Sequence, residues 1–178
     1  QTTLLVVSDH GMADMTPERV VYLDDYADVE APSERVYWGE PLGLWPRAGK
    51  ADSLYAVLAT AAIPHAQVYR RGTLPARLHF DGHAAIPPIL LLAEPGWTLT
   101  TRARAAARPM EGHWGVHGFD NAAPEMRAIF YARGPRFKEG TAAPPLSSID
   151  VYPLLAHALG LDPARVDGSL EASREMLR

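Results

Sequence analysis

The sequence has 178 residues, of which 47% are hydrophobic and 21% charged, and its formal net charge is −4. This balance is typical of a globular domain and excludes a disordered chain, which would combine low hydrophobicity with a large net charge. A slightly acidic chain also lacks the basic field that attracts nucleic-acid phosphates, so we expect no nucleic-acid binding. The longest apolar stretch, residues 86–93, is too short for a membrane span. The absence of cysteine excludes disulfides, thiolate nucleophiles and cysteine-type zinc sites.

The first third of the chain is predicted to form mainly strands. Residues 3–7 are an apolar, β-branched run that stops at a polar loop, which is typical of a central parallel strand. Weak alternation predicts strands over residues 20–26 and 33–38. Prolines and glycines predict a loop over residues 39–49. Apolar residues spaced along one face then predict a helix over residues 52–62.

The rest of the chain mixes strands with one further helix. Small, basic residues without periodicity predict an irregular surface segment over residues 98–109. A helix is predicted over residues 151–158, closed by Gly160. Apolar runs bounded by turn residues predict four more strands, over residues 67–71, 78–80, 88–93 and 127–132.

This order of elements predicts an α/β fold with a β-rich α+β subdomain inserted into it. We assign residues 1–19 and 109–178 to the α/β core and residues 20–108 to the inserted subdomain. Ligands of such sheets bind at the carboxyl ends of parallel strands, and Asp9 and His10 follow directly after the first predicted strand. A carboxylate and an imidazole are groups that zinc accepts as ligands. The alternative is an aspartate that caps a turn beside a surface histidine.

A second polar cluster spans residues 111–121 and contains two histidines and three glycines. The glycines argue against a helix, so we expect a loop in which the backbone can approach an ion closely. His117 is the better ligand candidate, whereas His113 is expected at the rim or against Trp114. The alternative is a glycine-rich loop with incidental histidines.

Other polar residues carry weaker signals. Asp120 and Asn121 are expected either to orient the imidazole of His117 or to cap the turn. Four histidines have no motif around them and are expected to be structural or incidental: His65, His79, His83 and His157.

Taken together, the two clusters resemble the C-terminal half of the catalytic domain of the nucleotide pyrophosphatase/phosphodiesterase family, in the alkaline phosphatase superfamily. The clusters are Ser8-Asp-His-Gly-Met12 and Gly115-Val-His-Gly-Phe-Asp-Asn121, with Phe119 where Tyr is commoner in the family. Further segments resemble the family in the same order: 69–75, 93–97, 126–130 with 133–135, and 150–154 with 159–161.

The resemblance implies part of an alkaline-phosphatase-like core sheet and a site for two zinc ions. Asp9 and His10 would hold one ion, and His117 would help to hold the other. The family attacks a phosphodiester with a Thr or Ser hydroxyl, forming a phospho-enzyme that water hydrolyses. The resemblance implies that this nucleophile belongs to a segment upstream of this chain, and no threonine here occupies its motif position. The implied substrate is a small nucleotide or another phosphodiester.

Three candidate ligands leave both zinc sites short of the usual four. We therefore expect catalysis to require the missing N-terminal half of the domain as a partner, and this chain alone to be inactive. Two alternatives stay open: a phosphonoacetate hydrolase or lipid-head-group phosphodiesterase of the same superfamily, or an inert fragment or half-domain that serves association. Only the resemblance bears on localisation, and it favours the periplasm or the extracellular space.

Overall fold

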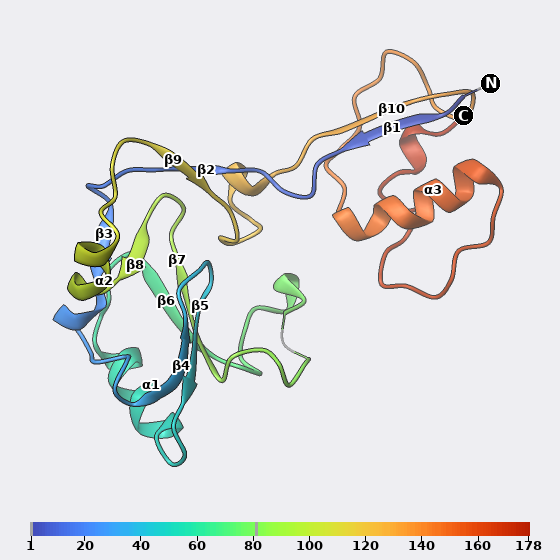
Figure 1. Ribbon diagram of the computed structural model, residues 1–178. Coiled ribbons are helices and arrows are strands. Elements are labelled where there is room, and N and C mark those ends of the chain that lie inside the picture. Colours follow the sequence, from blue (N-terminus) through green and yellow to red (C-terminus); the bar gives the residue numbers. More distant parts are fainter. Residues whose placement is uncertain (1, 81) are drawn as a thin grey trace. The chain divides into compact units, whose positions relative to one another are not determined.

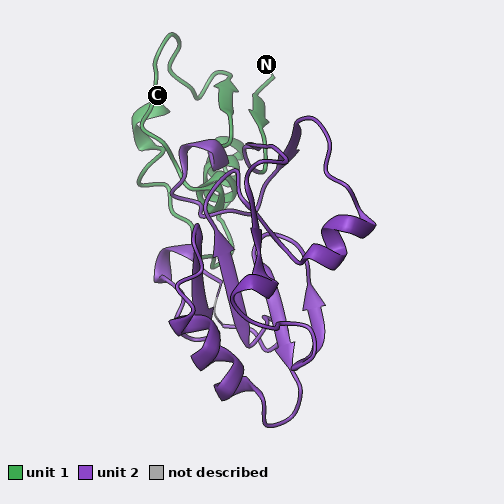
Figure 2. Ribbon diagram, turned by 90° about the vertical axis from the view of Figure 1, so that its left-hand side faces the viewer, with its two compact units in different colours: residues 1–9, 128–178 green, residues 10–127 purple. Residues whose placement is uncertain are grey.

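The computed structural model describes residues 2–80 and 82–178 of a mixed α/β chain (Figure 1). The chain divides into two compact units (Figure 2). The described residues up to Asp9 form unit 1 together with Ala128–Arg178, and His10–Arg127 form unit 2. The insertion of residues 20–108 into a core of residues 1–19 and 109–178 stays a prediction.

Unit 2 is built around a four-stranded antiparallel sheet with the order β4-β5-β7-β6. All five side chains of β7 are buried, because this inner strand carries an unbroken Ile-Leu-Leu-Leu-Ala run and has neighbours on both edges. The strands are β4 (Ser33–Tyr37), β5 (Leu42–Pro46), β6 (Ala66–Arg70) and β7 (Ile89–Ala93).

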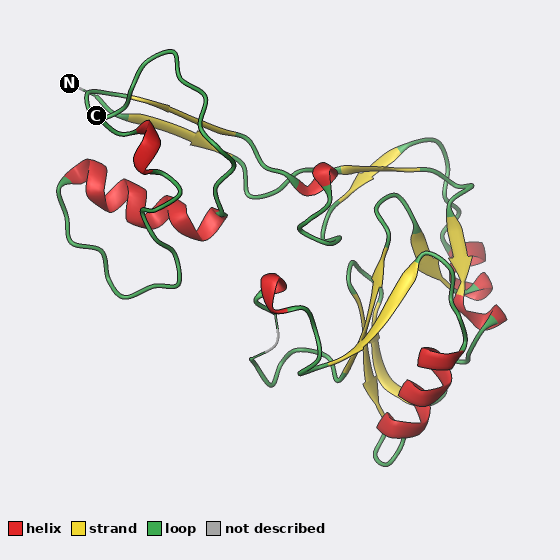
Figure 3. Ribbon diagram, turned by 180° about the vertical axis from the view of Figure 1, so that it is seen from behind, coloured by secondary structure: helices red, strands yellow, loops and turns green. Residues whose placement is uncertain are grey.

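Helix α1 (Ala51–Thr60) covers one face of this sheet (Figure 3). Leu54 and Leu58 lie one turn apart on the helix and are buried in the same cluster as Leu42, Leu44 and Leu91 of the sheet. The helix predicted over residues 52–62 is thus confirmed, with its end two residues earlier.

Two short strand pairs complete the β structure of unit 2. Strand β2 (Ala13–Met15) pairs antiparallel with β9 (Trp114–Val116), and β3 (Val20–Tyr22) pairs parallel with β8 (Thr98–Thr100). The helical elements that remain in this unit are η1 (Leu23–Asp25), η2 (Ala76–Leu78), α2 (Arg102–Ala107) and η3 (Pro124–Met126).

Unit 1 packs a helix against one face of a two-stranded sheet. Strand β1 (Leu4–Val7) pairs antiparallel with β10 (Phe130–Arg133), and α3 (Val151–Leu159) ends at Gly160 with a φ of 71°. This confirms the predicted helix and its glycine stop. The short helices η4 (Ser148–Asp150) and η5 (Arg174–Met176) flank the core of the unit, whose buried residues are Phe137, Leu154 and Met176. No helix in the described part of the chain is both long and apolar enough to cross a membrane.

The prediction of a buried, parallel strand at residues 3–7 is wrong for the chain as described here. Strand β1 pairs antiparallel with β10, and Leu4 and Val6 are 58% and 43% exposed. Within the described residues, β1 has one strand neighbour, and the core of unit 1 covers only the face that carries Leu5. The apolar run on both faces predicted a covered strand, but no described element covers the second face.

Three other predictions are corrected. The predicted loop at 39–49 contains β5, where Gly43 leaves the space that Pro87 fills: a Cβ there would lie 2.5 Å from the proline ring. The predicted strand at 78–80 is instead the end of η2 followed by a left-handed residue, His79, with a φ of 48°. The segment 98–109 forms β8 and α2, because Thr101 caps the alanine-rich helix by accepting a hydrogen bond from the Arg104 amide.

The inner position of β7 generates a stability prediction. Replacing Leu91, which is fully buried, with alanine is expected to lower the free energy of unfolding by about 2–5 kcal/mol, because it removes apolar contacts and leaves a cavity. Leu159→Ala at a side chain that is 61% exposed serves as the control and should change it by less than about 0.5 kcal/mol. Urea denaturation measures both, and equal effects would contradict this account of the core.

Candidate functional site

The structure brings His10 and His117 together in unit 2. Their imidazole rings stack with centroids 3.8 Å apart and planes inclined by 18°. The pairing of β2 with β9 explains the meeting, because Ala13 lies opposite Val116 and the segments just beyond this pair are held side by side. His10 precedes β2 and His117 follows β9, so residues far apart in sequence share one place.

Close backbone packing fixes the segment that carries His10. A Cβ on Gly11 would lie 2.0 Å from the carbonyl oxygen of Glu125 and 2.7 Å from that of Arg127. The Gly11 amide also donates to the Met126 carbonyl at 3.0 Å. Any larger residue at position 11 would have to push these backbones apart, so the residue after His10 must be glycine.

A second glycine fixes the segment that carries His117. Gly118 has a φ of +97°, a conformation that side chains disfavour, and a Cβ there would lie 2.3 Å from the Glu40 carbonyl oxygen. The next side chain, Phe119, is buried in the core of unit 2. His117 therefore projects from a loop with a fixed backbone on its C-terminal side, while the histidine itself is exposed.

The ring of His10 has a defined tautomer. Its Nδ1 lies 2.8 Å from the carbonyl oxygen of Gly11, and since a carbonyl only accepts, Nδ1 carries the hydrogen. A metal-bound imidazole usually donates its second N–H to an oxygen in this way, so the bond fits coordination through Nε2. The stacking brings this imidazole and that of His117, two candidate ligands from distant parts of the sequence, to one place.

Asp9, the third predicted ligand, is exposed and belongs to unit 1. Within the residues that the structure describes, no three histidine, aspartate or glutamate side chains are grouped closely enough to hold a metal ion. The assignment of Asp9, His10 and His117 to a metal centre thus stays a prediction, to which the stacked histidines add a fitting geometry.

Asp120 and Asn121 bind an arginine that the sequence analysis missed. The Arg77 guanidinium donates to both carboxylate oxygens of Asp120, at 2.5 and 2.6 Å, and holds the pKa of that carboxyl below its usual value. Asp120 also accepts from the Ala122 amide at 2.8 Å, which confirms the expected turn cap. No sequence signal links Arg77 to Asp120, because 43 positions separate them.

Glu40 is a second residue that the sequence analysis missed. Its carboxyl lies below the surface, and Oε2 is fully buried without a hydrogen-bond partner among the described residues. Burial raises the pKa of Glu40 to about 8, although a hydrogen bond that the carboxyl accepts from the Ala93 backbone acts in the opposite direction. The carboxyl is therefore mostly protonated at neutral pH, directly beside the loop of His117.

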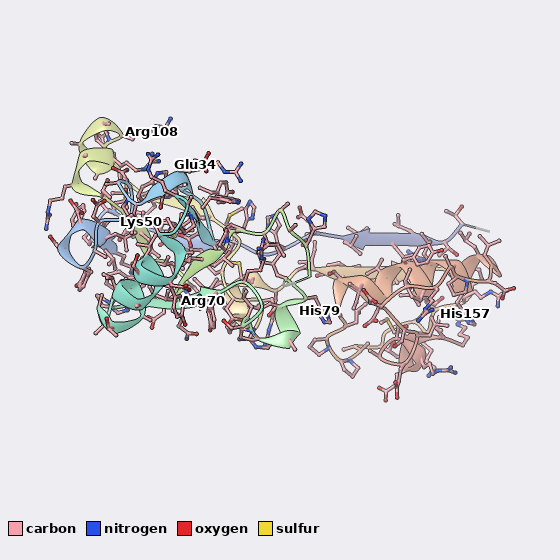
Figure 4. All side chains as sticks on the ribbon, turned by 90° about the horizontal axis from the view of Figure 1, so that it is seen from below. Glu34, Lys50, Arg70, His79, Arg108 and His157 are labelled. Carbon is pink, nitrogen blue, oxygen red and sulfur yellow. The ribbon has the colours of Figure 1, made fainter. Side chains whose placement is uncertain are left out.

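The other histidines have partners or positions of their own. His113 lies 3.1 Å from the carboxylate of Asp14, and both side chains are largely exposed. The imidazole of His65 stacks on Trp97 and lies 2.7 Å from the Glu94 carboxylate. His79, His83 and His157 are exposed, and Figure 4 shows His79 just after η2 and His157 on α3.

The buried carboxyl of Glu40 generates a pH prediction. Its pKa is raised from 4.5 to about 8, so between these values the folded protein keeps a proton that the unfolded chain releases. The free energy of unfolding should therefore fall as pH rises through this window. Glu40→Gln removes the titration, so the variant should gain stability over the unmodified protein on going from pH 5 to pH 9. Urea denaturation across that range measures this, and parallel pH curves for the two proteins would contradict the buried, protonated state.

Comparison with known proteins assigns the chain to a family. Residues 1–120 match the model of the type I phosphodiesterase/nucleotide pyrophosphatase family. The chain is 32% identical to human ectonucleotide pyrophosphatase/phosphodiesterase family member 5 and 31% identical to a bovine bis(5′-adenosyl)-triphosphatase. Each alignment covers 98% of this chain but only 35% and 36% of the relative. The chain thus spans about a third of the curated relatives that it matches.

Solved structures agree with this assignment. The structure of human ectonucleotide pyrophosphatase/phosphodiesterase 5 superposes with a TM-score of 0.86 at 31% identity, covering 99% of this chain and 45% of that one. An inactive threonine-to-alanine variant of the mouse protein, in complex with AMP, superposes with a TM-score of 0.85 at 32% identity and the same coverage. The predicted α/β fold, as part of an alkaline-phosphatase-like core, is confirmed. The chain belongs to the type I phosphodiesterase/nucleotide pyrophosphatase family.

Proposed function

We propose that the complete protein is a zinc-dependent phosphodiesterase that hydrolyses nucleotide phosphodiester or pyrophosphate bonds, and that this chain supplies part of its active site. The observation that carries the proposal is the stacking of His10 on His117 in a chain of this family. The tautomer of His10 supports coordination through Nε2. The relative named as a bis(5′-adenosyl)-triphosphatase and the AMP complex of the mouse relative support a nucleotide substrate.

In the proposed site, Asp9 and His10 would hold one zinc ion and His117 would help to hold the other. The two ions would stabilise charge on the phosphoryl oxygens and lower the pKa of the attacking hydroxyl. Gly11 and Gly118 keep the two backbones fixed while the ions and substrate bind.

The proposed reaction proceeds in two displacements at phosphorus. A Thr or Ser hydroxyl from outside this chain forms an ester bond to phosphorus as the bond to the leaving oxygen breaks, and the leaving group takes a proton. Water then cleaves the phospho-enzyme and releases a nucleoside monophosphate. The inactive threonine-to-alanine variant of the mouse relative supports a threonine nucleophile. Because that group and further ligands lie elsewhere, we propose that residues 1–178 do not catalyse the reaction alone.

The uncovered face of the β1–β10 sheet supports a role for the rest of the domain as partner. Leu4, Val6 and Tyr131 are exposed on this face, while Leu5 and Phe130 pack into the core of unit 1. Apolar side chains gathered on one sheet face mark a surface that another element covers. We propose that the remaining part of the catalytic domain is this element.

The proposed metal centre predicts a large effect of replacing His117 in the complete protein. His117→Ala should lower kcat by more than about 100-fold, because loss of a partner behind a metal ligand already costs about 10–100-fold. It should also reduce the bound zinc measured by mass spectrometry of metals. His157→Ala, at an exposed histidine of α3, is the control and should leave both unchanged. Full zinc binding by His117→Ala would contradict the assignment.

The substrate class is tested by assaying the complete protein on a nucleotide diester, a dinucleoside polyphosphate, phosphonoacetate and a glycerophosphodiester. We expect turnover of the first two, with release of a nucleoside 5′-monophosphate. Hydrolysis of phosphonoacetate without turnover of either nucleotide would favour the phosphonoacetate hydrolase alternative. Turnover of the glycerophosphodiester alone would favour the lipid-head-group alternative.

The uncovered sheet face predicts association of the 178-residue chain. Native mass spectrometry of this chain mixed with the remaining part of the domain should show a complex of both, because the exposed face would then be buried. A paired substitution, Val6→Lys with Tyr131→Lys, should weaken the complex, whereas Val57→Lys on the exposed face of α1 should not. A chain that stays monomeric in the mixture would count against this partner.

A further inference from the structure

The segment that carries His117 is bound on its far side by Arg77. The guanidinium donates to both Asp120 carboxylate oxygens and, at 3.0 Å, to the side-chain oxygen of Asn121. In return, the side-chain amide of Asn121 donates to the backbone carbonyl of Arg77 at 3.1 Å. Two consecutive residues of the loop are therefore tied to both the side chain and the main chain of one residue of η2. We call these four bonds the Arg77 clamp.

The Arg77 clamp has the features that make an ion pair strong. A planar guanidinium and a carboxylate joined by two parallel charge-assisted bonds have a defined geometry, unlike a flexible lysine pair. The Asp120 side chain is 28% exposed, so water screens it less than the average surface carboxylate. The pKa of Asp120 is lowered and that of Arg77 raised by the same contact, so both groups stay charged together.

The two residues between His117 and the Arg77 clamp are held in place by packing. Gly118 is packed against the Glu40 carbonyl with a positive φ, and Phe119 is buried. Asp120 follows at once and is held by Arg77 and by the turn to Ala122. Movement of Asp120 would therefore be transmitted through two constrained residues to His117.

We infer that Arg77 is a positioning residue for His117: through Asp120 and Asn121 it holds the 117–121 loop so that the imidazole stays against His10. Arg77 acts from the connection between β6 and β7, which contributes no predicted metal ligand. The effect on loop order follows from the contacts alone. The effect on catalysis rests on the proposed function of His117 as a metal ligand.

The experiment is hydrogen–deuterium exchange of the complete protein, followed on the peptide that contains residues 117–122. Arg77→Met keeps much of the side-chain length but removes the guanidinium that donates both bonds to Asp120. It should therefore speed exchange in this peptide by about tenfold or more, because the bidentate pair is lost. Asp120→Asn should do the same, and the double variant should exchange no faster than either single variant. Arg102→Met is the control, because Arg102 makes an arginine–aspartate pair elsewhere in unit 2, in which one guanidinium nitrogen donates to both Asp25 carboxylate oxygens at 2.7 and 2.5 Å. It should leave the peptide unchanged.

A second readout separates this inference from the proposed function. Arg77→Met should weaken zinc binding, measured by competition with a chelator, by about 10–100-fold, as expected for a partner behind a ligand. Unchanged exchange in Arg77→Met and Asp120→Asn would overturn the inference, whatever the activity. Faster exchange with unchanged zinc affinity would uphold the positioning of the loop and overturn the role of His117 as a ligand. If Arg77→Met does not fold, Arg77→Lys, which keeps the charge but not the guanidinium, is read by the same exchange measurement.

Discussion

Backbone packing at two glycines is the constraint on which the candidate site depends. Gly11 and Gly118 each follow one of the paired histidines, and each lies so close to a backbone carbonyl that no side chain fits. Backbones in such contact cannot slide past each other without breaking the packing of Met126 and Phe119 beneath them. The stacking of His10 on His117 thus rests on main-chain contacts, to which the Arg77 clamp adds a side-chain restraint.

Charge and burial act around this packing in different ways. The Arg77 clamp holds the loop by charged hydrogen bonds at its partly exposed end. On the other side, the backbone carbonyl of Glu40 packs against Gly118, while burial raises the pKa of the Glu40 carboxyl to about 8 and favours its neutral form. Water and the paired charge stabilise the ion pair at the exposed side. At the buried side the neutral acid has a lower free energy than an unpaired carboxylate would have. The loop is therefore supported without an unpaired charge in the interior.

The two units differ in how complete their packing is. Unit 2 has a four-stranded sheet in which strand β7 is buried throughout and one face is covered by α1. Unit 1 has a small core and an uncovered face on its two strands. This contrast matches the comparisons, in which the chain covers 45% of each of the superposed structures. The unit with the uncovered face also carries Asp9, a predicted metal ligand that follows β1 by two residues.

The sequence by itself determined the family-level features that depend on local residue order. The helices at 52–62 and 151–158 follow from spacing and end signals, and the strand at 88–93 follows from an apolar run too short for a helix. His10 is predicted from its place beside Asp9 at the end of a strand, and His117 from the glycines around it, which let the backbone approach an ion closely. The expectation that Asp120 caps a turn was also available from its residue type.

Tertiary structure decided what depends on contacts between distant residues. The loop predicted at 39–49 became strand β5 because β4 and β7 supply hydrogen bonds on both sides, which outweigh the local preference of its prolines and glycines. Arg77 and Glu40 have ordinary sequence neighbours, and their importance comes only from Asp120 and Gly118 being folded against them. The sequence shows which residue types can bind a metal. Bringing them together requires backbone packing between segments about a hundred positions apart, which no local sequence pattern encodes.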